Sequence, residues 1–326
     1  AFQVVWLGED RREDYLDKIR ELADDRPHAT AREAIVFEGD ARADFAANPK
    51  LGERLEAGSW PDSPRSAQAW LGDPVAIKEP TAALFRRQAA NHLLIVGQNG
   101  EAALGVTASA LISLAVQFAP ARDDQVREGA KFWILDGTPE DAEHAEALRK
   151  VAETLPHGVK VGGWREAAAF AKEVADELNR RREPDADDGP ELFLFVHDLP
   201  RLRDLRRRED DFHFGEREQE TPADLIDLIL REGPGFGIHL IAWCDTVNNL
   251  NRCVSMQQLR EFGMRVLFQM SPTDSGHLLD NPAAAKLGAN RALYYSEEHN
   301  RIEKFRPYAP PDDALMGRIR EALASR

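Results

Sequence analysis

A glycine-rich turn follows one of the most apolar strands that the sequence predicts. The run Leu93-Leu94-Ile95-Val96 is followed by Gly97-Gln98-Asn99-Gly100, and a long helix is expected from Ala102 to Phe118. A turn between a buried strand and a helix points backbone N–H groups at an anion, and the helix dipole adds to the attraction. The pattern indicates a phosphate-binding loop, although an ordinary strand–turn–helix connection would have the same spacing.

The side chains of this loop lack the groups that normally hold a nucleotide. In the pattern G-x-x-x-x-G-K-[ST] the lysine reaches the phosphates and the hydroxyl binds Mg2+. Counted from Gly97, these two positions are Ala103 and Leu104. The second glycine is replaced by Ala102, and Glu101 adds a repelling carboxylate. Loss of a charge-assisted hydrogen bond weakens binding by roughly 10- to 100-fold, so we expect weak ATP binding and doubtful Mg2+ binding.

Three further predicted strands end near residues that could take part in chemistry: Asp136, His197 with Asp198, and Trp243 with Cys244. Asp136 could cap the turn that follows it. His197 suits a buried strand end as well as acid–base chemistry, and no nucleophile motif precedes it. Asp198 lies beside His197 as its acidic neighbour, and Cys244 is most simply a buried cysteine. The histidines and cysteines show no spacing typical of metal ligands, so no metal site is predicted.

Five arginines follow within a short stretch that also carries Asp and Glu: Arg201, Arg203, Arg206, Arg207 and Arg208. Mixed charge of this kind is typical of a solvated helix with internal ion pairs. It could also form a loop that contacts a neighbouring subunit or nucleic acid. The polar stretch Asp210–Thr221 has no regular period, which predicts a mobile loop.

Alternating strands and helices predict the fold. Helices are expected over Glu140–Glu153 and from Trp164 to about Arg182. After the turn, strands are expected over the apolar runs Lys131–Asp136, Val159–Val161, Glu191–Asp198, Gly237–Trp243 and Met264–Gln269. Elements in this order indicate an α/β fold, a mostly parallel sheet with helices on both faces.

The first part of the chain is less regular. Phe2–Leu7 is typical of a strand, and a helix is expected after it up to about residue 25. Residues 39–73 are rich in Asp, Gly, Pro and Ser, which predicts an irregular connection with a short helix near Phe45. Pro74–Ile77 predicts a strand and Thr81–Asn91 an amphipathic segment. We therefore predict a small N-terminal α/β or irregular segment over residues 1–74 and one large domain over residues 75–326.

Composition limits the partners and the compartment. The chain has 326 residues and a formal net charge of −15, which argues against DNA binding by this domain alone and leaves DNA contact to an assembly. Two cysteines, Cys244 and Cys253, cannot form a disulfide framework, which favours a reducing, cytoplasmic location. The longest apolar run, Leu104–Ala119, is interrupted by polar residues, so no membrane span is predicted. Ala1 and the strand that follows at once favour a piece of a longer protein.

Four segments resemble the FtsK/SpoIIIE family of RecA-like motor ATPases: HLLIVGQNG, ELFLFVHDL, GFGIHLIAWCDT and MRVLFQMSPTDSGHLLDNPAAAKLG. The resemblance covers about residues 75–308 and implies a RecA-like P-loop NTPase fold. The acidic strand of the family ends in Asp-Glu, but here it ends in Asp198-Leu199, so the resemblance implies that Asp198 could still order Mg2+ whereas Leu199 cannot polarise the attacking water. The family's sensor Thr-Gln is replaced by Trp243-Cys244. Because the loop lysine and hydroxyl are missing as well, the resemblance implies a site that no longer hydrolyses ATP.

The resemblance implies two functions of different kinds. The first is a degenerate ATPase module, structural or regulatory, similar to the inactive modules of the type VII secretion translocase. Such a module would pack on other ATPase domains of the same or a parent chain. It could hold a peptide or protein in a nucleotide region made apolar by Ala103, Leu104, Leu199 and Trp243.

The alternative is an ATP-binding subunit of an active DNA translocase, completed in trans by a neighbouring subunit. Arg265 or the arginines at 201–208 would then supply the missing positive charge. A third hypothesis is a sensor that binds nucleotide without hydrolysis through the backbone amides of the loop alone.

Overall fold

The computed structural model describes residues 6–24, 41–122, 127–206 and 220–326. The chain divides into two units, Ala1–Gly39 and Asp40–Arg326. In the first unit, helix α1 (Glu9–Asp24) exposes an apolar face that includes Tyr15, Ile19 and Leu22. The helix expected there is confirmed, whereas most of the strand expected over Phe2–Leu7 lies outside the described residues. The second unit begins well before the boundary expected at residue 75.

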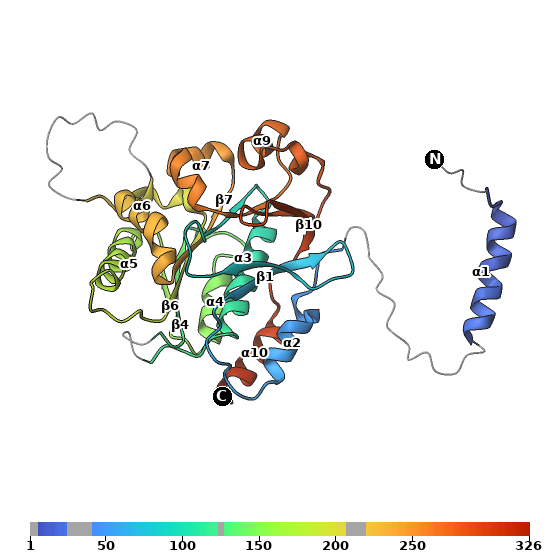
Figure 1. The fold of residues 1–326 in the computed structure, drawn as a ribbon, viewed down its shortest axis with the longest axis horizontal. Coiled ribbons are helices and arrows are strands. Elements are labelled where there is room, and N and C mark those ends of the chain that lie inside the picture. Colours follow the sequence, from blue (N-terminus) through green and yellow to red (C-terminus); the bar gives the residue numbers. More distant parts are fainter. Residues whose placement is uncertain (1–5, 25–40, 123–126, 207–219) are drawn as a thin grey trace. The chain divides into compact units, whose positions relative to one another are not determined.

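A ten-stranded sheet forms the centre of the second unit in the described residues, in the order β2-β1-β10-β9-β8-β3-β7-β6-β4-β5 (Figure 1). The strands are β1 (Ala67–Pro74), β2 (Thr81–Phe85), β3 (Leu93–Val96), β4 (Ala130–Asp136), β5 (Lys160–Gly162), β6 (Glu191–His197), β7 (Ile238–Cys244), β8 (Met264–Leu267), β9 (Ala292–Ser296) and β10 (Arg301–Pro307). The six from β8 to β5 pair in parallel, and the other four continue the sheet antiparallel.

Helices cover both faces of the sheet, as predicted. On one face lie α2 (Pro49–Glu56), α3 (Gly100–Ala115), α4 (Ala147–Thr154) and α10 (Asp313–Ala324), which share one hydrophobic core. On the other lie α5 (Ala167–Arg181), α6 (Pro222–Glu232), α7 (Val247–Cys253), α8 (Met256–Glu261) and α9 (Pro272–Leu279), which share a second core. The apolar strand residues alternate between these two cores, which explains why the parallel strands are apolar throughout.

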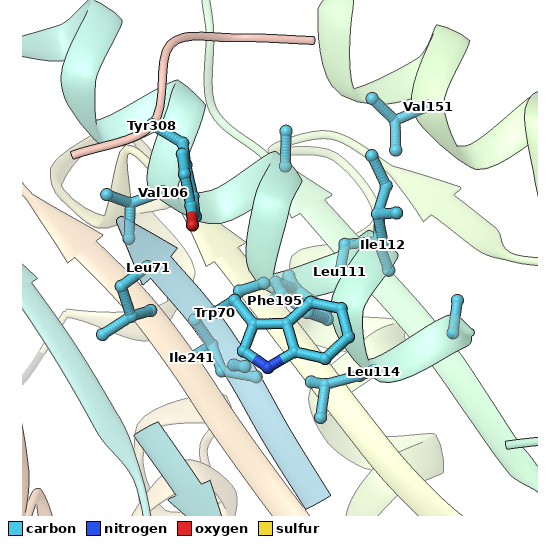
Figure 2. Packing of buried hydrophobic residues seen from close by; sticks show 14 of the residues in the cluster. Trp70, Leu71, Val106, Leu111, Ile112, Leu114, Val151, Phe195, Ile241 and Tyr308 are labelled. Carbon is cyan, nitrogen blue, oxygen red and sulfur yellow. The ribbon is translucent and has the colours of Figure 1, made fainter. Parts of the chain in front are cut away.

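Helix α3 is the most deeply buried of these helices. All its residues from Ala103 to Ala115 are buried, as expected for a helix that is apolar on every side. Figure 2 shows Leu111 and Leu114 beside Trp70 of β1, and Val106 beside Tyr308, which follows β10. Its small residues let neighbouring backbone approach closely, so the position of the helix is closely fixed.

Several local predictions differ from the structure, two of them because the antiparallel strands were not recognised. Pro74–Ile77 is not a strand, since β1 lies earlier, at Ala67–Pro74, within the stretch expected to be irregular. The segment expected at Thr81–Asn91 begins with β2. The helix expected over Glu140–Glu153 begins only at Ala147. Among the described residues, no helix has the length and apolar character needed to cross a bilayer.

The close approach of α3 predicts a contrast between two helical glycines. A Cβ on Gly105 would overlap the carbonyl oxygen of Tyr308, whereas a Cβ on Gly317 of α10 would meet no atom within 4 Å. We expect Gly105→Ala to lower the free energy of unfolding by about 1–3 kcal/mol, through overpacking. Gly317→Ala should leave it unchanged or raise it by up to about 1 kcal/mol, because alanine favours the helix. Urea unfolding measures both, and equal effects would contradict this packing.

Candidate functional site

The carboxyl ends of the parallel strands bring the predicted site residues together. β3 runs into Gly97, β7 ends with Trp243 and Cys244, β6 runs into Asp198, and β4 ends at Asp136. Since β3, β7, β6 and β4 are neighbours in that order, these residues lie along one edge of the sheet. This is the edge at which parallel α/β sheets bind their ligands.

The predicted phosphate loop is a short, closed turn. Gly97 has a φ of 137°, and a Cβ there would lie 2.7 Å from the Cβ of Phe268, so only glycine suits this position. Helix α3 already begins at Gly100, and Asn99 caps it by accepting a hydrogen bond from the Ala102 N–H at 3.1 Å. The turn is therefore tighter than the G-x-x-x-x-G spacing that encloses a phosphate.

Backbone amides of this turn are used within the protein. The Gly97 N–H donates to the Cys244 carbonyl at 3.1 Å, and the Gly100 N–H donates to the Gln98 carbonyl at 3.0 Å. The Ala103 N–H donates to the Asn99 carbonyl at 2.9 Å. A phosphate would have to compete with these acceptors and with the Asn99 cap. The geometry is that of the ordinary strand–turn–helix connection.

Trp243 lies against the turn. Its indole N–H donates to the Gly97 carbonyl at 3.1 Å. Its ring would be 3.6 Å from a Cβ on Gly100. On its other side the ring packs on His197, with 4.5 Å between the ring centroids. The space in front of the turn is thus occupied by a side chain of the protein itself.

The residues at the motif's lysine and hydroxyl positions belong to the core. Ala103 and Leu104 are buried with the other residues of α3, and Leu199 is buried in the core on the opposite face. A peptide in the nucleotide region, as the resemblance implies, would therefore contact these three side chains only if the cores opened; Leu199 also lines a small apolar pocket between β6, β7 and α6. Glu101 is partly exposed at the start of α3 and forms an ion pair with Arg42, so its charge is balanced.

Asp198 occupies the position expected for a magnesium-ordering carboxylate, but it is committed to another partner. Its backbone is left-handed, with φ 58° and ψ 54°. Arg201 Nε donates to its Oδ2 at 3.1 Å. Burial raises the pKa of the Asp198 carboxyl, Arg201 lowers it, and the carboxylates of Asp245 and Asp136 raise it further. The raised pKa shows that burial and the nearby carboxylates outweigh the arginine.

The remaining predicted residues have structural surroundings. Asp136 accepts a hydrogen bond from the Thr138 N–H at 2.9 Å and so caps the turn after β4. Cys244 is a buried free cysteine, and burial raises the pKa of its thiol. His197 is buried, with Nδ1 3.4 Å from the Thr107 hydroxyl. Burial lowers the pKa of His197 to about 4, although Asp136 acts in the opposite direction.

Arg265 cannot act as a donor to a neighbouring subunit in this conformation. Its guanidinium donates to three backbone carbonyls of the same chain, those of Leu259, Phe262 and Leu278. Its charge also lies over the ring of Tyr295, at 5.6 Å from the centroid. Of the arginine cluster, Arg207 and Arg208 and most of the loop expected at Asp210–Thr221 lie outside the described residues.

A cleft of about 1070 Å³ lies beside the closed turn, over the ends of β7, β6, β4 and β5. It is lined by predicted residues, among them Asp136, Asp198 and Trp243, and by three arginines of the cluster. Sequence reasoning missed Arg149, Trp164 and Asp245, which also line the cleft. Trp164 begins an expected helix and Asp245 follows an expected strand, which was a signal, whereas Arg149 lies within an expected helix; only the strand order shows that the three meet.

Comparison of the fold with solved structures finds ATPase domains. The cytoplasmic domain of the type VII secretion ATPase EccC from Thermomonospora curvata matches with a TM-score of 0.59 and 15% identity over 87% of this chain and 34% of its own. EssC (ATPases 2 and 3) from Geobacillus thermodenitrificans matches with a TM-score of 0.54 and 13% identity over 82% of this chain and 49% of its own. The chain thus spans a third to a half of these proteins.

A conjugation protein shares the fold as well. The pCW3 conjugation coupling protein TcpA, solved with ATPγS, matches with a TM-score of 0.52 and 16% identity over 78% of this chain and 70% of its own. No family model matches the sequence, and no curated protein matches it either. The predicted RecA-like fold is confirmed by these neighbours, and at such identities the likeness concerns the fold alone.

The buried histidine of the site predicts a loss of stability in acid. The unfolded chain binds a proton at His197 below about pH 6.5, whereas folded His197, with its pKa of about 4, does not. Stability therefore falls as the pH drops from 6.5 towards 4, by up to about 1.4 kcal/mol per pH unit for this one group. Urea unfolding at several pH values gives the slope of the unfolding free energy against pH. This slope should be shallower for His197→Asn than for the wild type. His144→Asn, at an exposed histidine, should keep the wild-type slope, and an unchanged slope in both variants would contradict the assignment.

Proposed function

We propose that the chain is a pseudo-ATPase module of a larger translocase, with a structural or regulatory role and without ATP hydrolysis. The observation that carries this proposal is the short turn at Gly97, whose Gly97 and Gly100 amides donate to backbone carbonyls and against which Trp243 packs. The side chains that bind phosphate, Mg2+ and the attacking water in phosphoryl transfer are absent from the corresponding positions. The loop lysine, the loop hydroxyl, the catalytic glutamate and the polar sensor are all replaced at the corresponding positions, which argues against hydrolysis.

The proposed partners are other ATPase domains of the same or a parent chain. The neighbours in secretion are proteins with several ATPase domains, and this chain spans only part of their length, which supports this view. One of them, Thermomonospora curvata EccC (ATPases 2 and 3), is solved in complex with a signal sequence peptide. A peptide at the closed turn of this chain would first have to displace Trp243. DNA would be contacted through the assembly.

The first test is catalytic. Purified chain with ATP and Mg2+ should release phosphate no faster than its Asp198→Asn variant, because neither protein has a group that activates water. Phosphate release is measured continuously at millimolar ATP. Turnover that disappears in Asp198→Asn would overturn the proposal, since it would show that the carboxylate supports catalysis. Equal low rates in both proteins would identify a contaminating ATPase.

The second test restores the missing side chains. Ala103→Lys with Leu104→Ser recreates the end of the phosphate-loop pattern, but both positions are buried in the core. We expect the double variant to lose about 2–5 kcal/mol of unfolding free energy and to gain no turnover, because a cavity forms and a charge is buried. Gln98→Lys is the matched control, since it adds the same charge at an exposed position of the same turn. A stable double variant that hydrolyses ATP would refute the assignment.

A further inference from the structure

Exposed apolar side chains gather at two places among the described residues. One group lies on α1 and just before it, and the other lies at the connection between β1 and β2 and on the neighbouring β10. In the same part of the chain, the other large apolar side chains that are exposed are Trp164 and Met256. Single exposed apolar residues are common on protein surfaces, whereas groups of them mark interaction sites. The two groups are therefore the surfaces at which we expect a partner.

The first surface is the apolar face of α1. Tyr15, Ile19 and Leu22 follow one another at the spacing of a helix face, and they are 55% to 62% exposed. Trp6 and Leu7, just before the helix, are exposed as well. Helices of about this length gain most of their stability from the packing of such a face. The helix carries four basic and seven acidic residues, so its formal charge is −3.

The second surface lies at the connection between β1 and β2. This connection begins beside β10, because Pro74 at the end of β1 pairs with Phe305 of β10. Within it, Ile77 is 81% exposed and Val75 is 44% exposed. Ile302, in the first half of β10, is 37% exposed. Three aliphatic side chains are thus exposed at this end of the sheet.

Basic residues surround the second surface, although the whole chain carries a charge of −15. Lys78 and Arg301 both form ion pairs with Glu303, whose side chain is only 11% exposed. Glu79 of the connection forms an ion pair with Lys50 at 3.2 Å. The cations therefore outnumber the carboxylates, and the outer charge here is positive. The hairpin surface is defined by its exposed residues: Val75, Ile77, Ile302, Lys78, Arg301 and Lys304.

We propose that α1 of one copy of this chain docks on the hairpin surface of a second copy. The apolar face of the helix covers the three aliphatic side chains, and its acidic residues meet the cations around them. Two acidic helices, or two basic hairpin surfaces, would repel each other, so unlike surfaces meet. Each copy has one surface of each kind, which makes the contact heterologous and lets further copies add.

The charge of α1 also argues against other occupants. A membrane with anionic lipids or a nucleic acid would be attracted to the hairpin surface alone, because both repel an acidic helix. A second copy supplies a partner of the right charge for both surfaces.

Sedimentation equilibrium of the whole chain at increasing concentration tests the proposal. We expect the average mass of the wild type to rise beyond that of a dimer in the micromolar range, because one helix forms a small interface. Ile19→Asp in α1 and Ile77→Asp in the hairpin surface should each weaken association by roughly 100-fold, since a carboxylate would be buried there. Met256→Asp, at an exposed residue of α8 outside both surfaces, should associate as the wild type does.

An equimolar mixture of the two impaired variants gives the sharper result. The Ile77→Asp copy keeps an intact α1, and the Ile19→Asp copy keeps an intact hairpin surface. Their mixture should therefore form a dimer with one copy of each and nothing larger, while each variant alone stays monomeric. This dimer should dissociate more readily as the salt concentration rises, because opposite charges contribute to the contact.

Four results would overturn the docking of α1. The first is a wild type that is monomeric at every concentration. The second is association of either variant alone, which would show that like surfaces pair. The third is a mixture that stays monomeric. The fourth is an affinity that does not change with salt, since the choice of surfaces rests on their charge.

This inference goes beyond the pseudo-ATPase assignment and does not rest on it. A monomeric wild type overturns the docking of α1 and leaves that assignment intact. ATP turnover that depends on Asp198 overturns the assignment, whatever the state of association.

Discussion

The burial of helix α3 is the constraint on which the rest of the site depends. The helix is apolar on all sides and is enclosed by the sheet, by α4 and by the chain after β10. Its first turn must therefore start close to the end of β3, which leaves only a short turn from Gly97 to Gly100. In an active phosphate loop the same place holds a wide loop around the phosphate. Here the turn from Gly97 to Gly100 is short because the closely packed helix begins directly after it.

Trp243 completes this arrangement from the neighbouring strand. Its indole N–H donates to the carbonyl of Gly97, and Trp243 also lines the open cleft over β6 and β4, together with Gln98 of the turn. An indole contributes large apolar area and a single donor, so it covers the turn and satisfies one of its carbonyls. The accessible space at this edge of the sheet extends from Gln98 of the turn to Asp198 and the arginines that follow β6.

Much of the parallel half of the fold could be predicted from the sequence. The apolar runs at β3, β4, β6, β7 and β8 were recognised because strands buried on both faces are continuously apolar. The antiparallel strands were missed: β1 has a glycine and a proline near its end, and the first four residues of β10 are exposed or half-buried. The strand expected over Pro74–Ile77 was wrong for that reason, since β1 ends at Pro74. The resemblance of four segments to RecA-like motors correctly indicated the fold.

The sequence by itself determined which groups are missing, because the absence of a lysine, a hydroxyl and a catalytic glutamate is a matter of residue type. It did not determine what fills the space they leave. Ala103, Leu104 and Leu199 could as well have lined a pocket, and only the packing of α3 and the strand order show them in the cores. Trp164 and Arg203 are far apart in the chain, and they face one cleft only because β5, β4 and β6 are adjacent. Burial and adjacency are properties of the assembled sheet, which no local pattern of residues specifies.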